Sequence, residues 1–169
     1  MAVSCLVSDL TVESTNAVNC SGAHLGSDST SSINNLFAGN WTLFGRAVDD
    51  NDDSYIEVDI GRSSGEWEVE DLTSGTFVVA LKAGDYYSTY LFSGVDFSDE
   101  IEGDFTTIGV AINHSGRGRR GIRGERLDHL SIYTLLTAVP LPGAFVLFGS
   151  AFIGLLGISW RYKNKVKLA

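Results

Sequence analysis

Proline, cysteine and histidine are scarce in this chain. It has two prolines and 19 glycines among 169 residues, which excludes a proline-rich linker or a collagen repeat. It has two cysteines and three histidines, and no histidine lies close to a cysteine pair in a spacing that would complete four metal ligands. We therefore expect no metal site and no cofactor. Hydrophobic residues make up 44% of the chain and charged residues 20%, so a disordered protein is also excluded.

Acidic residues are missing from the C-terminal part of the chain. The chain carries 12 Lys and Arg against 21 Asp and Glu. All 21 acidic residues and eight of the basic ones lie in residues 1–138, whose net charge is −13, whereas residues 139–169 carry +4. An acidic body of this kind excludes a conventional nucleic-acid binder. The length suits one globular domain, residues 1–138, followed by a short segment, residues 139–169.

The segment from Val139 to Trp160 contains 22 residues and no charge. Residues 143–160 would form about 27 Å of helix, close to the thickness of a bilayer's hydrocarbon core. The run has no polar face, which argues against a buried helix of a soluble protein. A basic tail at residues 161–169 follows, with positive charges at Arg161, Lys163, Lys165 and Lys167. We predict one C-terminal transmembrane helix in contact with the lipid bilayer.

The basic residues also predict the orientation of this helix. The tail is directly at the membrane edge and favours the cytoplasm, although a second cluster (Arg117, Arg119, Arg120, Arg123 and Arg126) competes with it. Because the tail is nearer, we expect residues 1–138 to lie outside the cytoplasm. Residues 1–10 lack the basic and apolar regions of an export signal. We expect either a start codon further upstream or a chain that begins near its mature end.

The residues before and after the predicted helix resemble a known sorting signal. Val139-Pro140-Leu141-Pro142, followed by Gly143, the apolar helix and a basic end, is similar to the PEP-CTERM signal of Gram-negative bacteria in its Val-Pro-Leu-Pro variant. The prolines hold the backbone extended, so its peptide groups are available to an enzyme at the membrane surface. Residues 139–143 are the expected sorting motif.

This resemblance implies a function and a location. Proteins with such tails are processed by an exosortase, a membrane-embedded peptidase, and are released or attached at the cell surface, often alongside exopolysaccharide. It implies a transient anchor in the bacterial inner membrane, a periplasmic ectodomain, and a non-catalytic product at the cell surface or outside the cell. Three stretches of the body also resemble β-rich ectodomains that precede such tails, namely residues 67–69, 79–84 and 129–133.

Residues 1–138 show the period-2 alternation of β-strands. Ile56, Val58 and Ile60 share one face of a strand, and residues 77–82 are apolar on both faces. We predict an all-β domain, an antiparallel β-sandwich of the jelly-roll kind. Only residues 31–37 are expected to be helical. The other predicted strands are residues 41–46, 66–70, 87–91, 107–112 and 127–135, and the predicted core contains Trp41, Trp67, Phe77, Leu91, Val110 and Ile132.

The two cysteines, Cys5 and Cys20, are 15 positions apart. In an exported chain such a pair is expected to form one disulfide, which would fix an otherwise loose N-terminal strand. If the chain is cytosolic instead, both thiols stay reduced.

The remaining candidates for chemistry are weak. Asp49–Asp53 invites a calcium site, but Ser54 and Ile60 stand where an EF-hand loop has glycine and glutamate, so an acidic hairpin loop is expected. Glu66, Glu68 and Glu70 share one strand face, which predicts a solvent-exposed surface. The Gly- and Arg-rich residues 115–126 are expected to form a solvated loop or a contact for an anionic polysaccharide, lipid or acidic neighbour.

Two other functions are compatible with the sequence. One is a tail-anchored membrane protein whose β domain stays in the cytosol. The other is a secreted enzyme or carbohydrate-binding module whose site lies in loops of the sandwich, because a fold does not decide a function. We expect no enzyme activity, since no nucleophile motif accompanies His24, His114 or His129.

Overall fold

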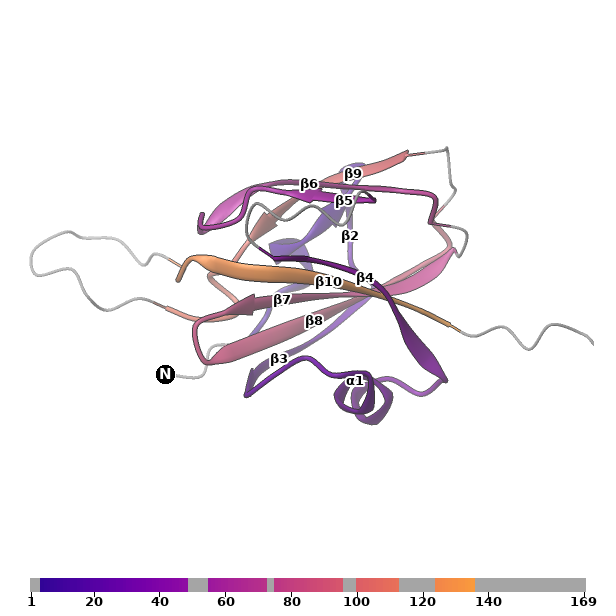
Figure 1. Cartoon of the computed structure of the whole chain (residues 1–169), viewed down its shortest axis with the longest axis horizontal. Coiled ribbons are helices and arrows are strands. Elements are labelled where there is room, and N and C mark those ends of the chain that lie inside the picture. Colours follow the sequence, from indigo (N-terminus) through magenta and orange to yellow (C-terminus); the bar gives the residue numbers. More distant parts are fainter. Residues whose placement is uncertain (1–3, 49–54, 73–74, 96–99, 113–123, 136–169) are drawn as a thin grey trace, which may run out of the picture. The chain divides into compact units, whose positions relative to one another are not determined.

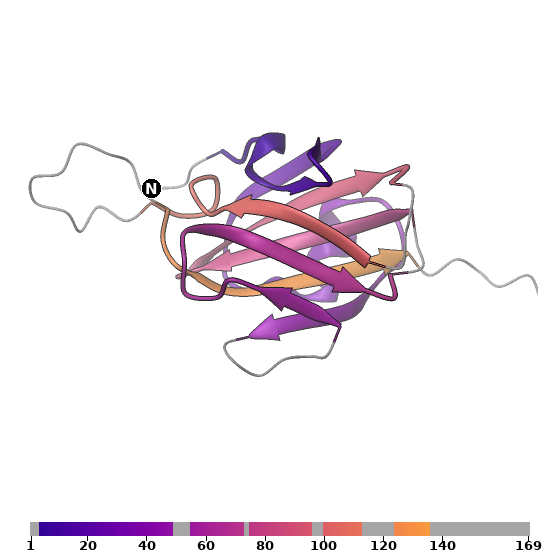
Figure 2. The same cartoon turned by 90° about the horizontal axis from the view of Figure 1, so that it is seen from above.

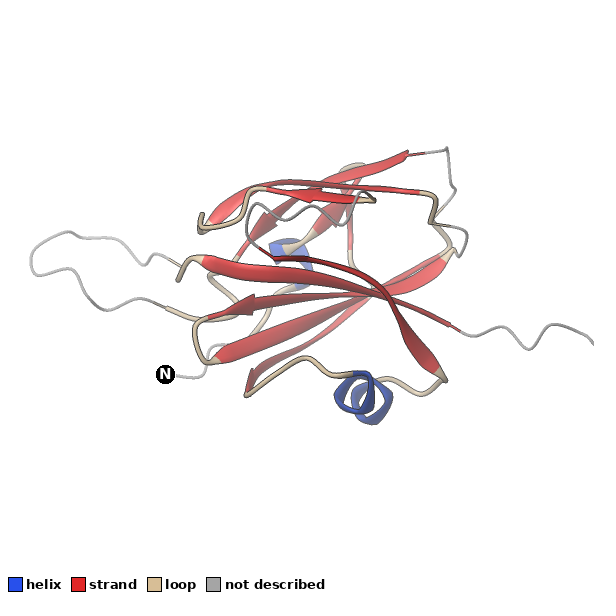
Figure 3. Cartoon of the chain, in the orientation of Figure 1, coloured by secondary structure: helices blue, strands red, loops and turns tan. Residues whose placement is uncertain are grey.

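The computed structural model describes residues 4–48, 55–72, 75–95, 100–112 and 124–135 (Figure 1). All of them belong to one compact unit, Met1–Leu136. The two helices in this part of the chain are short, and the rest of the regular structure is β-strand (Figure 3). The elements are η1 (Val7–Asp9), β1 (Thr11–Val12), β2 (Thr15–Asn16), β3 (Asn19–Leu25), α1 (Thr30–Leu36), β4 (Trp41–Val48), β5 (Ile56–Val58), β6 (Ser64–Glu70), β7 (Thr76–Ala83), β8 (Tyr86–Ser93), β9 (Glu100–Thr106) and β10 (Leu127–Leu135).

The strands form antiparallel sheets, as the alternation in the sequence predicts. One sheet has five strands in the order β3-β8-β7-β10-β4, and a second has three in the order β5-β6-β9. The three-stranded sheet lies over the larger one in a sandwich-like arrangement (Figures 1 and 2). The last of the described strands, β10, pairs with β7 on one side and with β4 on the other. The prediction of an all-β domain is therefore confirmed.

The short N-terminal hairpin of β1 and β2 forms a separate two-stranded sheet, which lies beside β9. The amide of Glu13 donates a hydrogen bond of 2.9 Å to the carbonyl of Glu102, and Leu10 bridges to Phe105. Gly103 of β9 allows β1 to approach closely, since a Cβ atom on this residue would lie 1.9 Å from the carbonyl oxygen of Thr11 in β1. Only glycine permits this contact without a shift of the backbone.

The core lies between the two sheets. Trp67 from β6 is buried there, and Phe77 and Phe92 from β7 and β8 stack with ring centroids 5.2 Å apart. Both faces of β7 are buried, as its continuous apolar run predicts. Of the predicted core residues, only Leu91 is partly exposed.

The outer face of the five-stranded sheet is covered by α1. Ser29 begins the helix by accepting a hydrogen bond of 3.2 Å from the amide of Ser32. Ile33, Phe37 and Trp41 then pack on a cluster of side chains of the sheet, and Figure 1 shows the helix beside this face. The sheet residues of this cluster are Val78, Ala80 and Tyr133. This second apolar layer explains why β7 and β10 are buried on both sides.

Most of the predicted elements match, and one does not. The strand predicted at residues 127–135 has the observed bounds, and the predicted helix at 31–37 differs from α1 by one residue at each end. The strand predicted at residues 107–112 is wrong. The amides of Val110 and Ala111 both donate to the carbonyl of Thr107, at 2.9 and 3.0 Å, so the chain turns there. The strand of this region is β9, which ends at Thr106.

Candidate functional site

The predicted sorting segment lies outside the described residues. This holds for the motif Val139–Gly143, the predicted helix at 143–160 and the basic residues Arg161–Lys167. Neither helix in the described part of the chain has the length and apolar character that crossing a bilayer requires. The acidic run Asp49–Asp53 and most of the Arg-rich segment also lie outside the described residues. Arg126, just before β10, is exposed.

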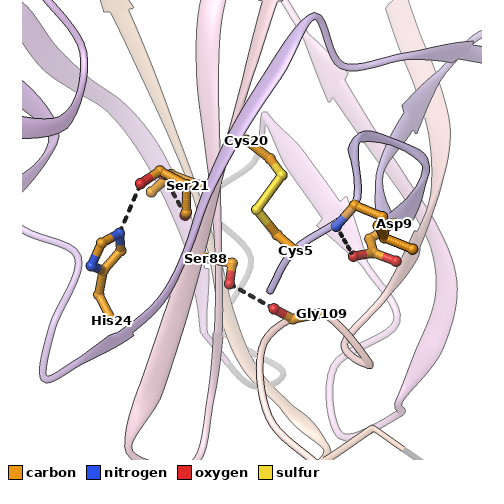
Figure 4. Close-up of a disulfide and its surroundings, with 9 residues drawn as sticks. Cys5, Asp9, Cys20, Ser21, His24, Ser88 and Gly109 are labelled. Atoms are coloured by element: carbon orange, nitrogen blue, oxygen red, sulfur yellow. Dashed lines mark hydrogen bonds between the residues drawn. A yellow bond between two sulfur atoms is a disulfide. The ribbon is translucent and has the colours of Figure 1, made fainter. Parts of the chain in front are cut away.

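The two cysteines form the predicted disulfide. Cys5 and Cys20 are bonded, with Cα atoms 6.2 Å apart, so the residues before η1 are joined to β3 (Figure 4). The segment from Ser4 to Asp9 is also held by a hydrogen bond of 3.2 Å from the amide of Ala17 to the carbonyl of Val7, and Asp9 is buried. The disulfide adds a covalent link between this segment and the five-stranded sheet.

A group of buried polar atoms lies next to this disulfide. Asp9 accepts a hydrogen bond of 2.6 Å from the amide of Leu6, and Ser88 donates one of 2.9 Å to the carbonyl of Gly109 (Figure 4). Burial raises the pKa of Asp9, and the hydrogen bond from Leu6 opposes this rise. Burial and the charge of Asp9 also raise the pKa of Tyr90.

A serine and a histidine on β3 form a pair that the sequence did not reveal. The Ser21 hydroxyl and the His24 Nε2 atom are 2.9 Å apart, at an irregularity in the pairing of β3 with β8 (Figure 4). The imidazole also packs against Tyr87, with ring centroids 5.2 Å apart. A catalytic serine–histidine pair needs a third group that orients the histidine. Among the described residues no carboxylate bonds to His24, so the pair is better explained as a local link in an edge strand.

The outward face of the three-stranded sheet is strongly acidic. Glu68 on β6 stands opposite Glu57 on β5 and Glu102 on β9, and Glu66 stands opposite Asp104. With the turn between β1 and β2, these residues line a hollow of about 580 Å³. The acidic residues of the hollow are Glu13, Glu57, Asp59, Glu66, Glu68, Glu102 and Asp104. The prediction that Glu66, Glu68 and Glu70 share an outward strand face is confirmed.

The charges of this face repel one another. Partial burial and the neighbouring carboxylates of Glu100, Glu57 and Glu70 raise the pKa of Glu68. In the described part of the chain, no three histidine, cysteine or carboxylate side chains converge closely enough to hold a metal ion. What the face can do is attract diffuse cations and basic groups and repel anionic surfaces.

A buried charged network lies on the other sheet, below α1. Asp28 is fully buried, and its carboxylate contacts the Arg46 Nη2 atom at 3.2 Å and the His129 Nε2 atom at 2.7 Å. The Tyr133 hydroxyl donates to the main-chain carbonyl of Asp28 at 2.6 Å, and the Arg46 Nε atom donates to the Ser131 hydroxyl at 2.8 Å. The network thus joins the loop before α1 to β4 and to three alternate residues of β10.

The network keeps Asp28 ionised. Burial alone would raise the pKa of this carboxyl, but hydrogen bonds with His129 and Ser131 and the charges of His129 and Arg46 outweigh burial and lower the pKa. The sequence did not single out Asp28, because its partners are 18 to 105 positions away. Every polar group named here is bonded to another protein group, which is typical of a network that holds a fold together.

The chain was compared with protein-family models, with curated proteins and with solved structures, and none of the three comparisons found a match.

Proposed function

We propose that this chain is an exported, non-catalytic cell-surface protein whose C-terminal segment is a PEP-CTERM-like sorting signal read by an exosortase. The observation that carries the proposal is the order of features in residues 139–169. A proline-bracketed motif precedes an uncharged run that ends at Trp160, and a basic tail follows. This order is that of a membrane-spanning helix with a recognition site on one side and a cytoplasmic anchor on the other.

One feature of the β domain supports export. The Cys5–Cys20 disulfide is the kind of bond that persists in oxidising compartments such as the periplasm.

Each part of the segment has its own role in this proposal. Residues 143–160 span the inner membrane as a temporary anchor, and the basic residues from Arg161 to Lys167 hold the tail in the cytoplasm. Pro140 and Pro142 limit the backbone to extended conformations, so little entropy is lost when a peptidase groove binds the motif. After processing, the β domain reaches the cell surface, where exopolysaccharide is the expected neighbour.

The test is the mass and location of the protein in cells with and without the exosortase. We expect a shorter product at the cell surface only when the enzyme is present. The double variant Pro140→Ala with Pro142→Ala should remain unprocessed in the inner membrane with its anchor intact. Normal processing of this variant would contradict direct reading of the motif.

The competing function is a tail-anchored protein with a cytosolic β domain. Thiol labelling of the native protein, before and after reductant, separates the two proposals. We expect Cys5 and Cys20 to react only after reduction. Ready labelling without reductant would contradict both the oxidising compartment and export.

A further inference from the structure

The residues before β1 show an inverted arrangement of polar and apolar side chains. We call Ser4–Asp9 the N-terminal arm, which contains η1 and ends where Leu10 bridges to β9. Its two large apolar residues, Leu6 and Val7, are 62% and 38% exposed, whereas Asp9 is only 6% exposed. Burial of apolar side chains normally holds a segment on a domain, and burial of a charged one disfavours the contact.

The hydrogen bond that the Asp9 carboxylate accepts lies within the arm itself. Its donor is the amide of Leu6, 2.6 Å from the Asp9 Oδ2 atom. This bond therefore does not depend on whether the arm lies on the domain. On the domain side, the same oxygen packs closely on Gly109, where a Cβ atom would lie 2.0 Å from it. The glycine makes the room that the buried carboxylate occupies.

In the described part of the chain, no ion pair compensates the charge of Asp9. The titratable group that this charge affects is the buried Tyr90 hydroxyl of β8. β2, which packs on η1, has no titratable side chain, and the carboxylates of Glu102 and Asp104 in β9 line the hollow on the outward face of their sheet. Burial raises the pKa of Asp9, although the hydrogen bond from Leu6 opposes the rise.

The disulfide holds the arm in place four positions before this buried charge. Cys5 is bonded to Cys20 of β3, and its Cα atom would lie 3.0 Å from a Cβ atom on Gly109 (Figure 4). The Val7 carbonyl also accepts a hydrogen bond of 3.2 Å from the amide of Ala17. One such bond contributes less than the burial of an uncompensated carboxylate costs. The covalent link therefore opposes the tendency of the charge to leave.

We infer that the N-terminal arm is a latch controlled by redox state and pH: the disulfide keeps it closed, and when the bond is open the ionised Asp9 releases it up to Leu10. Opening occurs by exchange with a dithiol, which becomes a disulfide as two electrons and two protons pass to Cys5 and Cys20. The bridge of Leu10 to β9 keeps β1 in place, so the sheets stay folded. In acid, Asp9 is protonated and the arm remains closed even without the disulfide.

The test follows the arm through the thiol of Cys5. Cys20→Ser in the full-length chain leaves Cys5 free, and its reaction with a dipyridyl disulfide is timed between about pH 4 and pH 8. At each pH the rate is divided by that of the same chain unfolded in urea, which removes the pH dependence of the thiol itself. We expect Cys5 to react at about the unfolded rate at the alkaline end and about tenfold more slowly at the acid end.

Asp9→Asn in the same background separates the charge from the shape of the side chain. It keeps an oxygen that can accept from Leu6, and should leave Cys5 protected about tenfold across the whole pH range. Asp85→Asn, an exposed carboxylate in the turn between β7 and β8, is the matched control and should behave like Cys20→Ser alone. Urea unfolding checks that each variant keeps its folded sheets. Equal protection of Cys5 with and without Asp9→Asn would overturn the inference.

A second measurement uses the disulfide-bonded chain and needs no cysteine substitution. Because the charge of Asp9 favours the open arm, it also favours the reduced state of the Cys5–Cys20 pair. At about pH 7, Asp9→Asn should therefore need about tenfold more dithiol, relative to its oxidised form, for half-reduction, and Asp85→Asn should match wild type. The same midpoint for Asp9→Asn and wild type would show that the charge does not act on the latch and would overturn it.

Discussion

Tyr133 and Asp28, 105 positions apart in the chain, are joined by a hydrogen bond of 2.6 Å from the tyrosine hydroxyl to the aspartate carbonyl. The bond connects the C-terminal part of β10, on the face that α1 covers, to the loop before α1. Asp28 also contacts Arg46 of β4 and His129 of β10. One buried carboxylate therefore holds both strands and the loop before α1 together. The stability of the domain should therefore depend strongly on this site.

Removing parts of the network should lower stability in a defined order. Tyr133→Phe deletes one hydrogen bond of a buried hydroxyl and should lower the free energy of unfolding by about 1 kcal/mol. Asp28→Ala leaves Arg46 and His129 without their carboxylate, and should cost about 3 kcal/mol. Urea unfolding measures both. In the double variant the two losses should not add, since the residues are in contact, and additive losses would show that they act independently.

Two buried aspartates should give the stability opposite dependences on pH. The lowered pKa of Asp28 means that its contribution is present above the unfolded value, near 3.8, and is lost as the pH falls through the folded pKa. The raised pKa of Asp9 means that its contribution is present below the unfolded value, 3.8, and is lost as the pH rises through the folded pKa.

Unfolding measured between pH 3 and pH 7 tests these two signs with single variants. Compared with wild type, Asp28→Asn should lose the acid-induced drop in stability. Asp9→Asn should lose the decline that appears as the pH rises above the unfolded pKa. A wild-type pH profile in either variant would contradict the role of that residue.

Opening the disulfide should weaken the domain without changing its fold. The bond closes a loop of 15 positions, for which the chain-entropy model gives about 3 kcal/mol. We expect Cys5→Ser with Cys20→Ser to lower the free energy of unfolding by roughly this amount, and reduction of the wild type to have the same effect. Hydrogen exchange should show the largest loss of protection in residues 4–9 and in β3, and equal losses throughout would contradict a local role.

Removing one charge from the acidic sheet face should stabilise the domain. Glu68 stands opposite two other glutamates, so Glu68→Gln relieves like-charge repulsion and should raise the melting temperature by about 1–2 °C. The gain should disappear in about 0.5 M salt, where such repulsion is screened. Asp85→Asn, an exposed carboxylate in a turn, is the matched control. An equal rise for both variants would show that overall charge matters rather than the sheet face.

The sequence predicted the elements whose signals are local. β10 was predicted with its observed bounds because Leu127, Leu130 and Ile132 mark a strongly apolar strand. β3 was missed because its residues are small and polar, and its position depends on pairing with β8 and on the disulfide. The alternation of Ile108, Val110 and Ile112 predicts a strand where the structure has the turn at Thr107. What decides the turn is hydrogen bonding to Ser63 and Glu125, which lie far from it in the chain.

The candidate sites were also predictable from the sequence only where their signal is local. The spacing of Glu66, Glu68 and Glu70 showed one acidic strand face, but the hollow also needs β5, β9 and the N-terminal turn, whose pairing no local pattern contains. The Asp28 network was not visible at all, since a lone aspartate before a helix has no distinguishing spacing. Disulfide pairing was predictable because only two cysteines exist.

The place of β10 in the sheet has a consequence for how the domain is synthesised. β10 is the last of the described strands along the chain, yet it lies between β7 and β4. Until Leu135 has emerged, β4 has no partner in the sheet and Asp28 has neither His129 nor Tyr133. The five-stranded sheet therefore cannot close during synthesis of the earlier strands. Folding of this sheet is delayed until β10 itself has been made.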